Sequence, residues 1–242
     1  MKYLTLFLLA GLLTACSPTQ DATPDSPEIY FQEAEAYQEK GLYNEAIESW
    51  EKVRDSFYSP ELTMLAELKL AETYYLDERY PEAASAYRDF INQYPGDPRR
   101  ASATYWLGMS YFQQMLSVDR DQTSTRNALS AFNELLRLYP GENDEQEIRS
   151  LIQQCQNRLA AHELYVGRFY LRSKQYPSAV KRLEDVLQQY PDYAHNDESY
   201  YNLVVAYLRM DDRSKAEAIF QDFSDAYPAS PYLLKAQKKL EK

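Results

Sequence analysis

The feature that most constrains the fold is a recurring Tyr-Pro dipeptide. Four copies follow amphipathic segments, in the sequences NQYPGDP, RLYPGEN, QQYPDYA and DAYPASP. Proline has no backbone N–H to donate inside a helix, so each dipeptide indicates the end of a helix. Two further copies, in RYPEA and QYPSA, lie between helical segments. The pattern predicts a chain of helices divided at regular intervals.

Small and aromatic residues recur at fixed offsets between these stops. In the second repeat, Ala71 is followed by Tyr74, Ala83, Tyr87 and Pro95. The small positions of the five repeats are Ala34 and Ala46, Ala71 and Ala83, Gly108 and Ala128, Gly167 and Ala179, and Val204 and Ala216. This is the tetratricopeptide pattern, in which small residues let two helices of a hairpin approach closely. Each hairpin leaves an apolar face that its neighbour covers. The predicted fold is therefore all-α, a tetratricopeptide superhelix of about five helix hairpins.

Two insertions interrupt an otherwise constant repeat length. The repeats start near Pro27, Met64, Ala101, Ala160 and Asp197, in steps of 37, 37, 59 and 37 residues. Eight extra residues within SVDRDQTSTRN join the helices of the third hairpin, and 14 within GENDEQEIRSLIQQCQN lengthen the first helix of the fourth. Asp144, with Glu147 three residues later, is a candidate N-cap for that long helix. We expect an N-terminal half over residues 28–142, with repeats one to three. Residues 143–242 form the other half, with the long helix and repeats four and five.

The first residues are typical of an export signal. Lys2 precedes an apolar run of about ten residues, too short to span a bilayer and typical of a signal peptide. The run ends in Leu13-Thr14-Ala15-Cys16, which resembles the bacterial lipobox. The resemblance implies a lipoprotein signal peptide over residues 1–15 and a diacylglycerol on the Cys16 thiol, with acyl chains such as palmitate. The alternative is a chance cysteine after an ordinary signal peptide.

The segment after Cys16 is predicted to be a flexible tether over residues 16–27. SPTQDATPDSP is polar, contains three prolines and has no apolar periodicity, so it cannot pack. Fully extended, it reaches ~35–40 Å, which keeps the folded part near a membrane. By resemblance to enterobacterial lipoproteins, Ser17 after the cysteine permits transfer to the outer membrane. We expect a lipid-anchored protein on the periplasmic face of that membrane.

Charge and motifs disfavour nucleic-acid binding and catalysis. The formal net charge is −11, whereas phosphate binding needs clustered Lys and Arg. His162 and His195 lie far apart, with no Cys or His at metal-ligand spacing. Cys155 lies in a helical pattern without an accompanying base, so a buried side chain is favoured over a nucleophile. We expect no enzyme activity, no cofactor and no metal.

The first helices of the hairpins line the concave side of such an array. Candidate groove residues there are Phe31, Glu35, Gln38, Glu72, Tyr75, Tyr105 and Phe112. Aromatic side chains beside carboxylates suit an extended or helical peptide, although each of these residues has packing against the next hairpin as its alternative. The fourth and fifth repeats are more basic, with Arg168, Arg172 and Arg209, and arginine suits carboxylate recognition. The alternative there is a solvated charged face.

Two long stretches resemble the BamD family, the outer-membrane tetratricopeptide lipoproteins of the β-barrel assembly machinery. They are WLGMSYFQQMLSVDRDQTSTRNALSAFNELLRLYP and RLAAHELYVGRFYLRSKQYPSAVKRLEDVLQQYPD. The insertion Asp119–Thr123 and the long fourth-repeat helix separate this family from generic repeats. The chain departs from the enterobacterial members at Ser173-Lys174, where they have Arg-Gly.

The resemblance implies a non-enzymatic scaffold with three kinds of protein partner. The C-terminal repeats would dock the periplasmic domain of the barrel-forming assembly protein, beside other assembly lipoproteins. The N-terminal groove would receive the C-terminal signal of unfolded outer-membrane proteins. Arg182 matches a family arginine implicated in docking of the assembly protein, and Arg158 and Glu163 fall in register with the family. With Arg168 and Arg172 of the basic face, the predicted docking residues are Arg158, Glu163, Arg168, Arg172 and Arg182. The competing hypothesis is a different repeat lipoprotein, which recruits peptidoglycan or cell-division enzymes.

Overall fold

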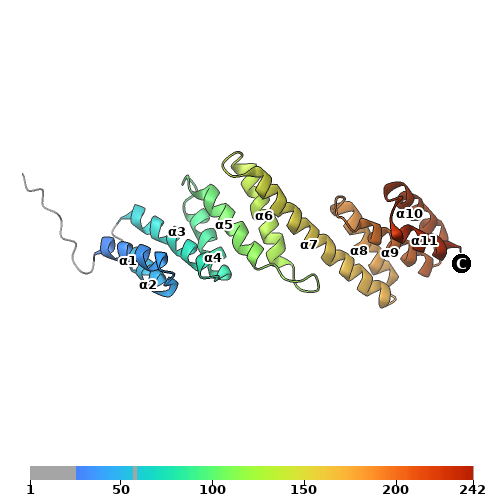
Figure 1. The fold of residues 1–242 in the computed structure, drawn as a ribbon, viewed down its shortest axis with the longest axis horizontal. Coiled ribbons are helices and arrows are strands. Elements are labelled where there is room, and N and C mark those ends of the chain that lie inside the picture. The colour runs from blue at the N-terminus through green and yellow to red at the C-terminus, as the bar shows by residue number, and fades with distance from the viewer. Residues whose placement is uncertain (1–25, 57–58, 242) are drawn as a thin grey trace, which may run out of the picture.

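The computed structural model describes residues 26–56 and 59–241. The predicted signal peptide and Cys16 lie outside the described residues. The described part contains eleven α-helices and no strand. Each of the first ten helices packs chiefly against its neighbours in the sequence, and the helices follow one another along the long axis of the molecule (Figure 1). The predicted all-α tetratricopeptide fold is confirmed.

The helices form five hairpins and one additional helix. The hairpins are α1 (Pro27–Glu39) with α2 (Tyr43–Asp55), α3 (Pro60–Leu76) with α4 (Tyr80–Gln93), α5 (Arg100–Gln113) with α6 (Thr123–Leu138), α7 (Glu145–Arg172) with α8 (Tyr176–Gln189), and α9 (Asn196–Arg209) with α10 (Arg213–Ala226). The additional helix is α11 (Pro231–Leu240), which packs against α9 and α10.

The Tyr-Pro dipeptides end four of the second helices in nearly the same geometry. Their tyrosines are the C-cap residues, with φ between −119° and −136° and ψ between 56° and 65°. Each tyrosine N–H still donates to the carbonyl four residues earlier, and the next residue is the proline. A residue before proline is excluded from helical backbone angles by a clash with the ring, which explains the abrupt end. The tyrosines are Tyr94, Tyr139, Tyr190 and Tyr227.

The turn inside a hairpin places one residue in the left-handed region. Gly41, Glu78, Lys174 and Asp211 occupy this position in four hairpins, with φ of 71°, 57°, 60° and 61°. Only the first of them is glycine, the residue that adopts this conformation without strain. The third hairpin has no such turn, because the predicted insertion replaces it with the loop of residues 114–122.

Small residues set the distance between the two helices of a hairpin. A Cβ atom on Gly108 would lie 2.6 Å from Cε1 of Phe132, and one on Gly167 would lie 2.9 Å from Leu183. The alanines that recur at the same position of the second helices are all fully buried. They are Ala46, Ala83, Ala128, Ala179 and Ala216. The packing role predicted for these residues is confirmed.

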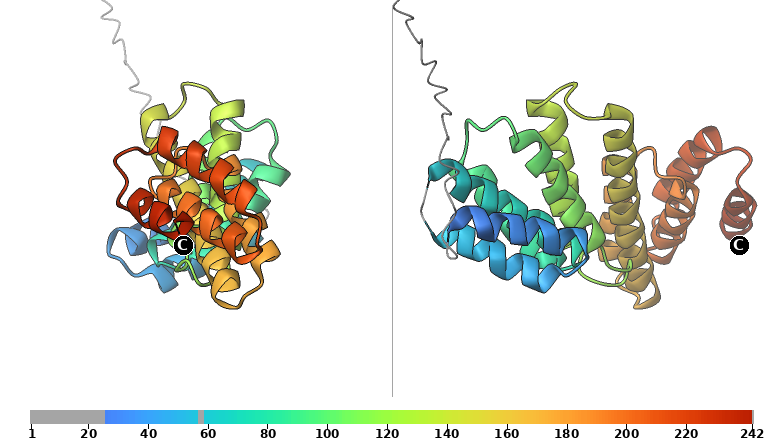
Figure 2. Two further views of the ribbon diagram at one scale, coloured as in Figure 1. Left: turned by 90° about the vertical axis from the view of Figure 1, so that its right-hand side faces the viewer. Right: turned by 60° about the vertical axis from the view of Figure 1, so that its left-hand side comes forward.

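The predicted long helix is α7, whose 28 residues contribute to two hydrophobic cores. Ile148, Leu151 and Cys155 pack with α5 and α6, whereas Ala160 and Leu164 pack with α8 and α9. Figure 2 shows α7 between these two parts of the array. Cys155 is fully buried, and burial raises the pKa of its thiol to about 12. Because one helix serves both cores, the division at residue 143 remains an interpretation.

Asp144 caps α7, as the sequence predicts. Its Oδ1 atom accepts hydrogen bonds from the backbone N–H groups of Gln146 and Glu147, at 2.9 and 3.2 Å. The side chain of Glu147 does not complete a capping box. It accepts a hydrogen bond from the hydroxyl of Tyr105 on α5 instead, at 2.9 Å.

The sequence analysis did not predict α11, although its start has a recognisable signal. Ser230 precedes Pro231, and its hydroxyl accepts a hydrogen bond from the N–H of Tyr232 at 3.1 Å. The same Ser-Pro start occurs at α1 and at α3, which begins four residues before the predicted repeat start at Met64. None of the helices over residues 26–56 and 59–241 is both long and apolar enough to cross a membrane.

Candidate binding surfaces

The array offers two faces, each with shallow depressions. The first-helix face is formed by α1, α3, α5, α7 and α9, with α11 at its end. The second-helix face is formed by α2, α4, α6, α8 and α10. Depressions open on the first-helix face near Trp106, Arg158 and Arg209. Others open on the second-helix face near Asp89 and Glu163.

The first depression, here called the N-terminal groove, lies between the second and third hairpins. It has a volume of about 150 Å³ and is lined by Leu68, Glu72, Tyr75, Leu76, Tyr87, Ser102 and Trp106. The Tyr75 ring meets Trp106 and Tyr80 edge-on, with centroids 4.8 and 5.4 Å apart. Leu76 is 42% exposed at the rim. Two predicted groove residues, Glu72 and Tyr75, therefore lie side by side in an aromatic pocket with one carboxylate.

Gln38 connects the first hairpin to this groove. Its amide donates to Glu72 at 3.2 Å and accepts from the buried hydroxyl of Thr73 at 2.8 Å. Lys69 also pairs with Glu72, at 2.8 Å. These bonds orient the carboxylate that borders the pocket. Gln38 thus has a structural contact, and its role in binding stays a prediction.

The other predicted groove residues are not gathered in one pocket. Phe31 packs edge-on against buried Trp50, with centroids 4.8 Å apart, and Glu35 is exposed. Tyr105 donates to Glu147 on α7, and burial together with this hydrogen bond raises the pKa of Tyr105 to about 12. Phe112 packs toward Phe132 in the core. Trp106, which the sequence analysis did not select, is the ring that closes the groove.

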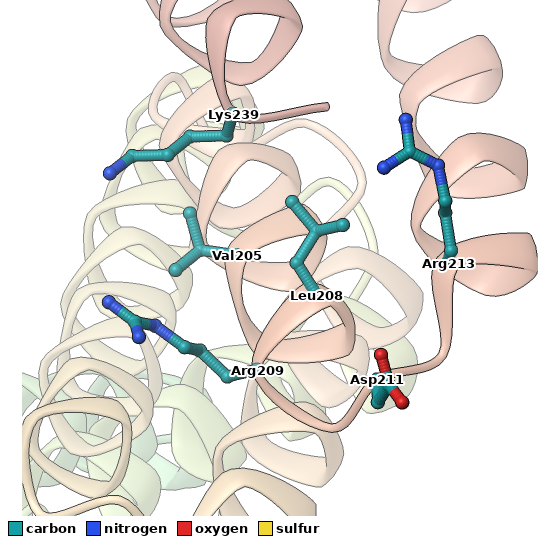
Figure 3. A pocket seen from close by; sticks show the side chains of 6 residues that line it. All are labelled: Val205, Leu208, Arg209, Asp211, Arg213 and Lys239. Carbon is teal, nitrogen blue, oxygen red and sulfur yellow. The ribbon is translucent and has the colours of Figure 1, made fainter. Parts of the chain in front are cut away.

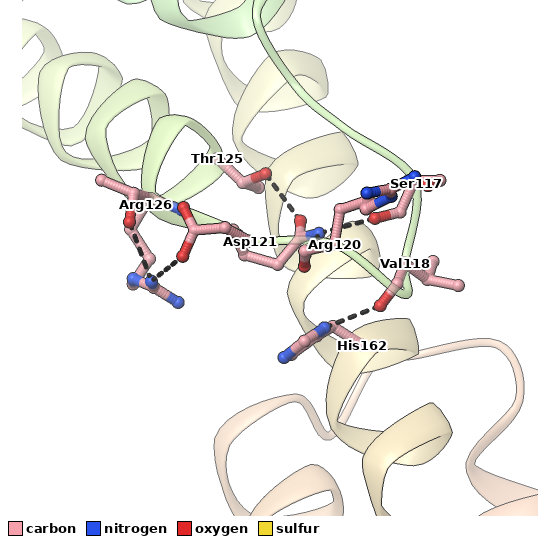
Figure 4. A network of polar contacts seen from close by, with 9 residues as sticks. Ser117, Val118, Arg120, Asp121, Thr125, Arg126 and His162 are labelled. Atoms are coloured by element: carbon pink, nitrogen blue, oxygen red, sulfur yellow. Dashed lines mark hydrogen bonds and ion pairs between the residues drawn. The ribbon is translucent and has the colours of Figure 1, made fainter.

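Hydrogen bonds order the insertion between α5 and α6 internally, and one of its carbonyl groups accepts a hydrogen bond from α7 (Figure 4). Gln122 is 1% exposed. Its amide donates to the carbonyls of Ser117 and Arg120, at 2.9 and 3.0 Å, and accepts from Thr125 at 2.8 Å. His162 on α7 has Nδ1 2.7 Å from the carbonyl oxygen of Val118, so this nitrogen carries the proton. The loop therefore has a defined position on the long helix.

Two carboxylates of the same loop are stabilised in their charged form. The side chain of Asp121 accepts from Thr123, and this hydrogen bond lowers the pKa of Asp121. Asp119 accepts from the hydroxyl of Ser117, which lowers its pKa in the same way. An open depression of about 570 Å³ lies between this loop and α7, and Arg158 is among its lining residues.

One exposed face of α7 combines arginines with aromatic side chains. Arg158, Tyr165, Arg168, Phe169 and Arg172 are spaced three, four or seven residues apart, so they share one side of the helix. Tyr165 and Phe169 are 40% and 49% exposed. Arg168 pairs with Glu198 on α9 at 3.2 Å. The sequence analysis found the arginines but missed the two aromatics, which their spacing of four on a helix would have revealed.

The remaining predicted docking residues lie on the other face. Arg182 of α8 donates to Glu163 of α7 at 2.8 Å, and their side chains are 42% and 21% exposed. Glu163 borders a depression of the second-helix face, together with Arg126 and Tyr190. The five predicted docking residues are therefore divided between two faces, with α7 contributing to both.

This chain belongs to the class of tetratricopeptide-repeat proteins, because its helix hairpins pack in series and leave two open faces with shallow grooves. Within the part of the chain that the structure describes, no group of three or more His, Cys, Asp or Glu side chains is placed to hold a metal ion. Among solved structures, the TPR2AB domain of yeast Sti1 in its complex with pHSP90 matches with a TM-score of 0.47 at 14% identity, covering 89% of this chain and 83% of that one. The TPR domain of P58(IPK) has a TM-score of 0.47 at 16% identity, covering 89% and 55%.

Proteins similar in sequence indicate a particular family, whereas the solved structures above share only the fold. The outer membrane protein assembly factor BamD of Caulobacter vibrioides is 31% identical over 170 residues, which is 70% of this chain and 56% of the relative, slightly over half of its length. The BamD protein of Rickettsia prowazekii is 28% identical over 234 residues, covering 96% of this chain and 93% of the relative. The model of the YfiO family, described as an outer membrane lipoprotein, matches residues 23–219. The chain belongs to this family, and the predicted resemblance to BamD is confirmed.

Proposed function

We propose that this protein is a lipid-anchored scaffold of outer-membrane β-barrel protein assembly, located on the periplasmic face of the outer membrane. In this role Cys16 carries the lipid. The N-terminal groove binds unfolded outer-membrane proteins, and the surfaces around α7 dock the barrel-forming assembly protein. The observation that carries the proposal is the match of the family model to residues 23–219. The Rickettsia relative, which matches this chain over nearly its whole length, is named as an outer membrane protein assembly factor.

The geometry of the N-terminal groove supports binding of an aromatic-ended peptide. Its walls are the rings of Tyr75, Tyr87 and Trp106, and Glu72 adds one acceptor at the edge. Aromatic rings prefer edge-on or offset contacts with other rings, and each such pair contributes ~0.5–1.5 kcal/mol beyond simple burial. An extended segment would place one aromatic side chain in the pocket and continue along the first-helix face toward the insertion loop.

Charge and exposure support docking at α7 and α8. Arg182 is held by Glu163 but keeps 42% of its side chain exposed, so it has hydrogen-bond donors left for a second carboxylate. On the other face, Tyr165 and Phe169 are exposed beside Arg158 and Arg172, which make no ion pair with any described residue. Aromatic residues and arginines are enriched at the centres of protein interfaces.

The experiment is an affinity purification of the full lipidated chain from detergent-solubilised envelopes, with the Arg182→Glu variant beside the parent. We expect a large barrel-forming protein to co-purify with the parent and to be depleted by the variant. Arg137→Glu is the matched control, because Arg137 is exposed on α6 and makes no ion pair with any described residue. Recovery of peptidoglycan enzymes in place of a barrel protein would favour the competing envelope-adaptor function.

A charge swap separates docking from internal pairing. In the double variant Glu163→Arg/Arg182→Glu, the ion pair between α7 and α8 is restored with reversed polarity. If Arg182 contacts the partner, the swap leaves co-purification impaired. If Arg182 only supports the fold, the swap restores it, and the docking assignment is wrong.

Groove and anchor have tests of their own. Leu76→Glu places a carboxylate at the groove rim and should weaken binding of a labelled peptide with a C-terminal phenylalanine. Leu234→Glu is the control, because Leu234 is 65% exposed on α11.

Cys16→Ser should abolish incorporation of radiolabelled palmitate and release the chain from membrane pellets. Unchanged labelling of Cys16→Ser would contradict the anchor.

A further inference from the structure

A basic pocket on the first-helix face lies at the far end of the array and belongs to neither proposed surface. It is a pocket of about 440 Å³ between α9, the turn after it and α11, here called the terminal pocket. The lining residues are Val205, Leu208, Arg209, Asp211, Arg213 and Lys239 (Figure 3). Val205 and Leu208 give it an apolar floor, and three of the other four side chains are cationic.

Two of the three cations in the terminal pocket have no ion-pair partner among residues 26–56 and 59–241. Arg213 pairs with Glu217 at 2.9 Å and also donates to the carbonyl of Leu240. Arg209 and Lys239 make no ion pair with any described residue. Figure 3 shows both extending on the same side of α9, on either side of Val205. The site therefore presents two available cations flanking an apolar surface.

We propose that the terminal pocket binds an acidic, amphipathic segment of a partner protein, as a protein-binding site additional to the groove and to the surfaces of α7 and α8. Carboxylates of the segment pair with Arg209 and Lys239, and an aliphatic side chain between them rests on Val205 and Leu208. Arginine pairs with a carboxylate through two parallel hydrogen bonds, which fixes orientation as well as adding attraction.

The charge of the rest of the molecule makes this site selective. With a net charge of −11, the protein repels an acidic segment over most of its surface and attracts it where cations lack acidic neighbours. Asp211 is the one carboxylate among the lining residues. An acidic partner is thereby guided to one end of the array.

The position of the pocket favours a protein segment over the anionic lipid of a membrane surface. Helix α1, where the described chain begins, lies at one end of the long axis, and α11 lies at the other (Figure 1). This choice of source rests on the proposed anchor, because a chain tethered near α1 holds its opposite end away from the point of attachment.

The test is a fluorescence polarisation titration with the full chain in detergent. The probe is a fluorescein-labelled helical peptide whose one face alternates leucine and glutamate. The reference peptide has glutamine in place of every glutamate. We expect the acidic peptide to bind and the glutamine peptide to bind at least about tenfold more weakly. Equal binding of the two peptides would overturn the proposal.

A pair of matched variants assigns the binding to the pocket. Arg209→Glu/Lys239→Glu should weaken the acidic peptide by about tenfold or more, with a smaller dependence on salt. Lys235→Glu/Lys238→Glu carries the same change in net charge on α11 outside the pocket, and should stay within about twofold of the parent. An equal loss of peptide affinity in the two double variants would mean that only the net charge of the protein matters, which contradicts binding in the terminal pocket. Circular dichroism of each variant confirms that it is folded.

A third arm distinguishes the two sources of negative charge. Vesicles of phosphatidylglycerol and phosphatidylethanolamine are mixed with the parent and with the pocket variant, both carrying Cys16→Ser so that no lipid anchor contributes. Binding of the parent to the vesicles that is lost in the pocket variant would replace the protein segment with a lipid surface. None of these titrations involves Arg182, so failure of the terminal pocket leaves the proposed docking function to its own test.

Discussion

The close approach of α5 and α6 at Gly108 makes a quantitative prediction for Gly108→Ala. The new Cβ atom would lie 2.6 Å from Cε1 and 2.8 Å from Cδ1 of Phe132. Non-bonded carbons prefer ~3.5–4.0 Å, so the overlap is about 1 Å at two ring atoms. The ring of Phe132 is fully buried between α5 and α6 and cannot turn into solvent. Either the ring or the helix has to shift.

Two opposing terms set the size of the effect. Added carbon in a packed core costs about 1–3 kcal/mol, and contact at two ring atoms places this case in the upper part of that range. Alanine favours a helix interior over glycine by ~1 kcal/mol. We expect the free energy of unfolding to fall by ~1–2 kcal/mol, whereas helix propensity alone predicts a rise.

The measurement is the midpoint of urea unfolding followed by circular dichroism, with attention to an unchanged slope. Gly96→Ala is the control, because a Cβ there meets nothing within 4 Å and φ is not in the left-handed region. Phe132→Leu in the Gly108→Ala background provides room for the added carbon, so the double variant should be less destabilised than the sum of the two single variants. A Gly108→Ala protein as stable as the parent, or strict additivity with Phe132→Leu, would refute the reasoning.

Three further predictions concern the turns, the insertion loop and alkaline pH. Lys174→Gly should stabilise the protein by ~0.5–1 kcal/mol in urea unfolding, because Lys174 has φ of 60° and glycine relieves the strain; an unchanged midpoint would contradict this. Gln122→Ala removes three hydrogen bonds and should cost ~1–3 kcal/mol, with faster deuterium exchange in residues 117–123 and unchanged exchange in α1; protected loop amides would count against it. The pKa of Tyr105 is raised from 10.0 to about 12, so the stability tied to its protonated hydroxyl is complete below pH 10 and is lost as pH rises through 12. Tyr105→Phe should therefore show a smaller alkaline loss in urea unfolding, and an identical loss would refute the assignment.

The sequence predicted the repeat and the long helix because both depend on local chemistry. Proline ends a helix wherever it follows a tyrosine cap, and alanine at a fixed offset is small in every repeat. The same reasoning would have found α11 from Ser230-Pro231, since that pair repeats the start of α1 at Ser26-Pro27. The five-repeat register ends at Pro228, so the register alone gives no indication of α11.

The candidate surfaces were less predictable, because they depend on pairs far apart in the chain. Spacing on a helix placed Arg168 and Arg172 on one face of α7, but it did not reveal that Arg182 lies on the opposite side of the array beside Glu163. Thr73 approaches Gln38 across 35 residues, and nothing in the local pattern indicates that contact. Spacing of four residues places Tyr165 and Phe169 on the same side of α7 as the arginines, whereas their exposed fractions, 40% and 49%, follow only from how α7 packs in the array.

The arrangement of α7 bears on how such a scaffold operates. Its 28 residues span ~42 Å at 1.5 Å per residue. Near its start Glu147 accepts from Tyr105 of the third hairpin, in its middle His162 binds the insertion loop, and near its end Arg168 pairs with Glu198 of the fifth hairpin. Because α7 contacts the third hairpin, the insertion loop and the fifth hairpin, it holds the N-terminal groove and the C-terminal surfaces at a fixed separation. In the proposed function, binding at one end positions a partner for the other end by geometry, without a conformational change. A helix-breaking Asn157→Pro substitution, between Cys155 of one core and Ala160 of the other, should therefore uncouple the surfaces, so that peptide binding in the groove persists while co-purification of the docked partner is lost.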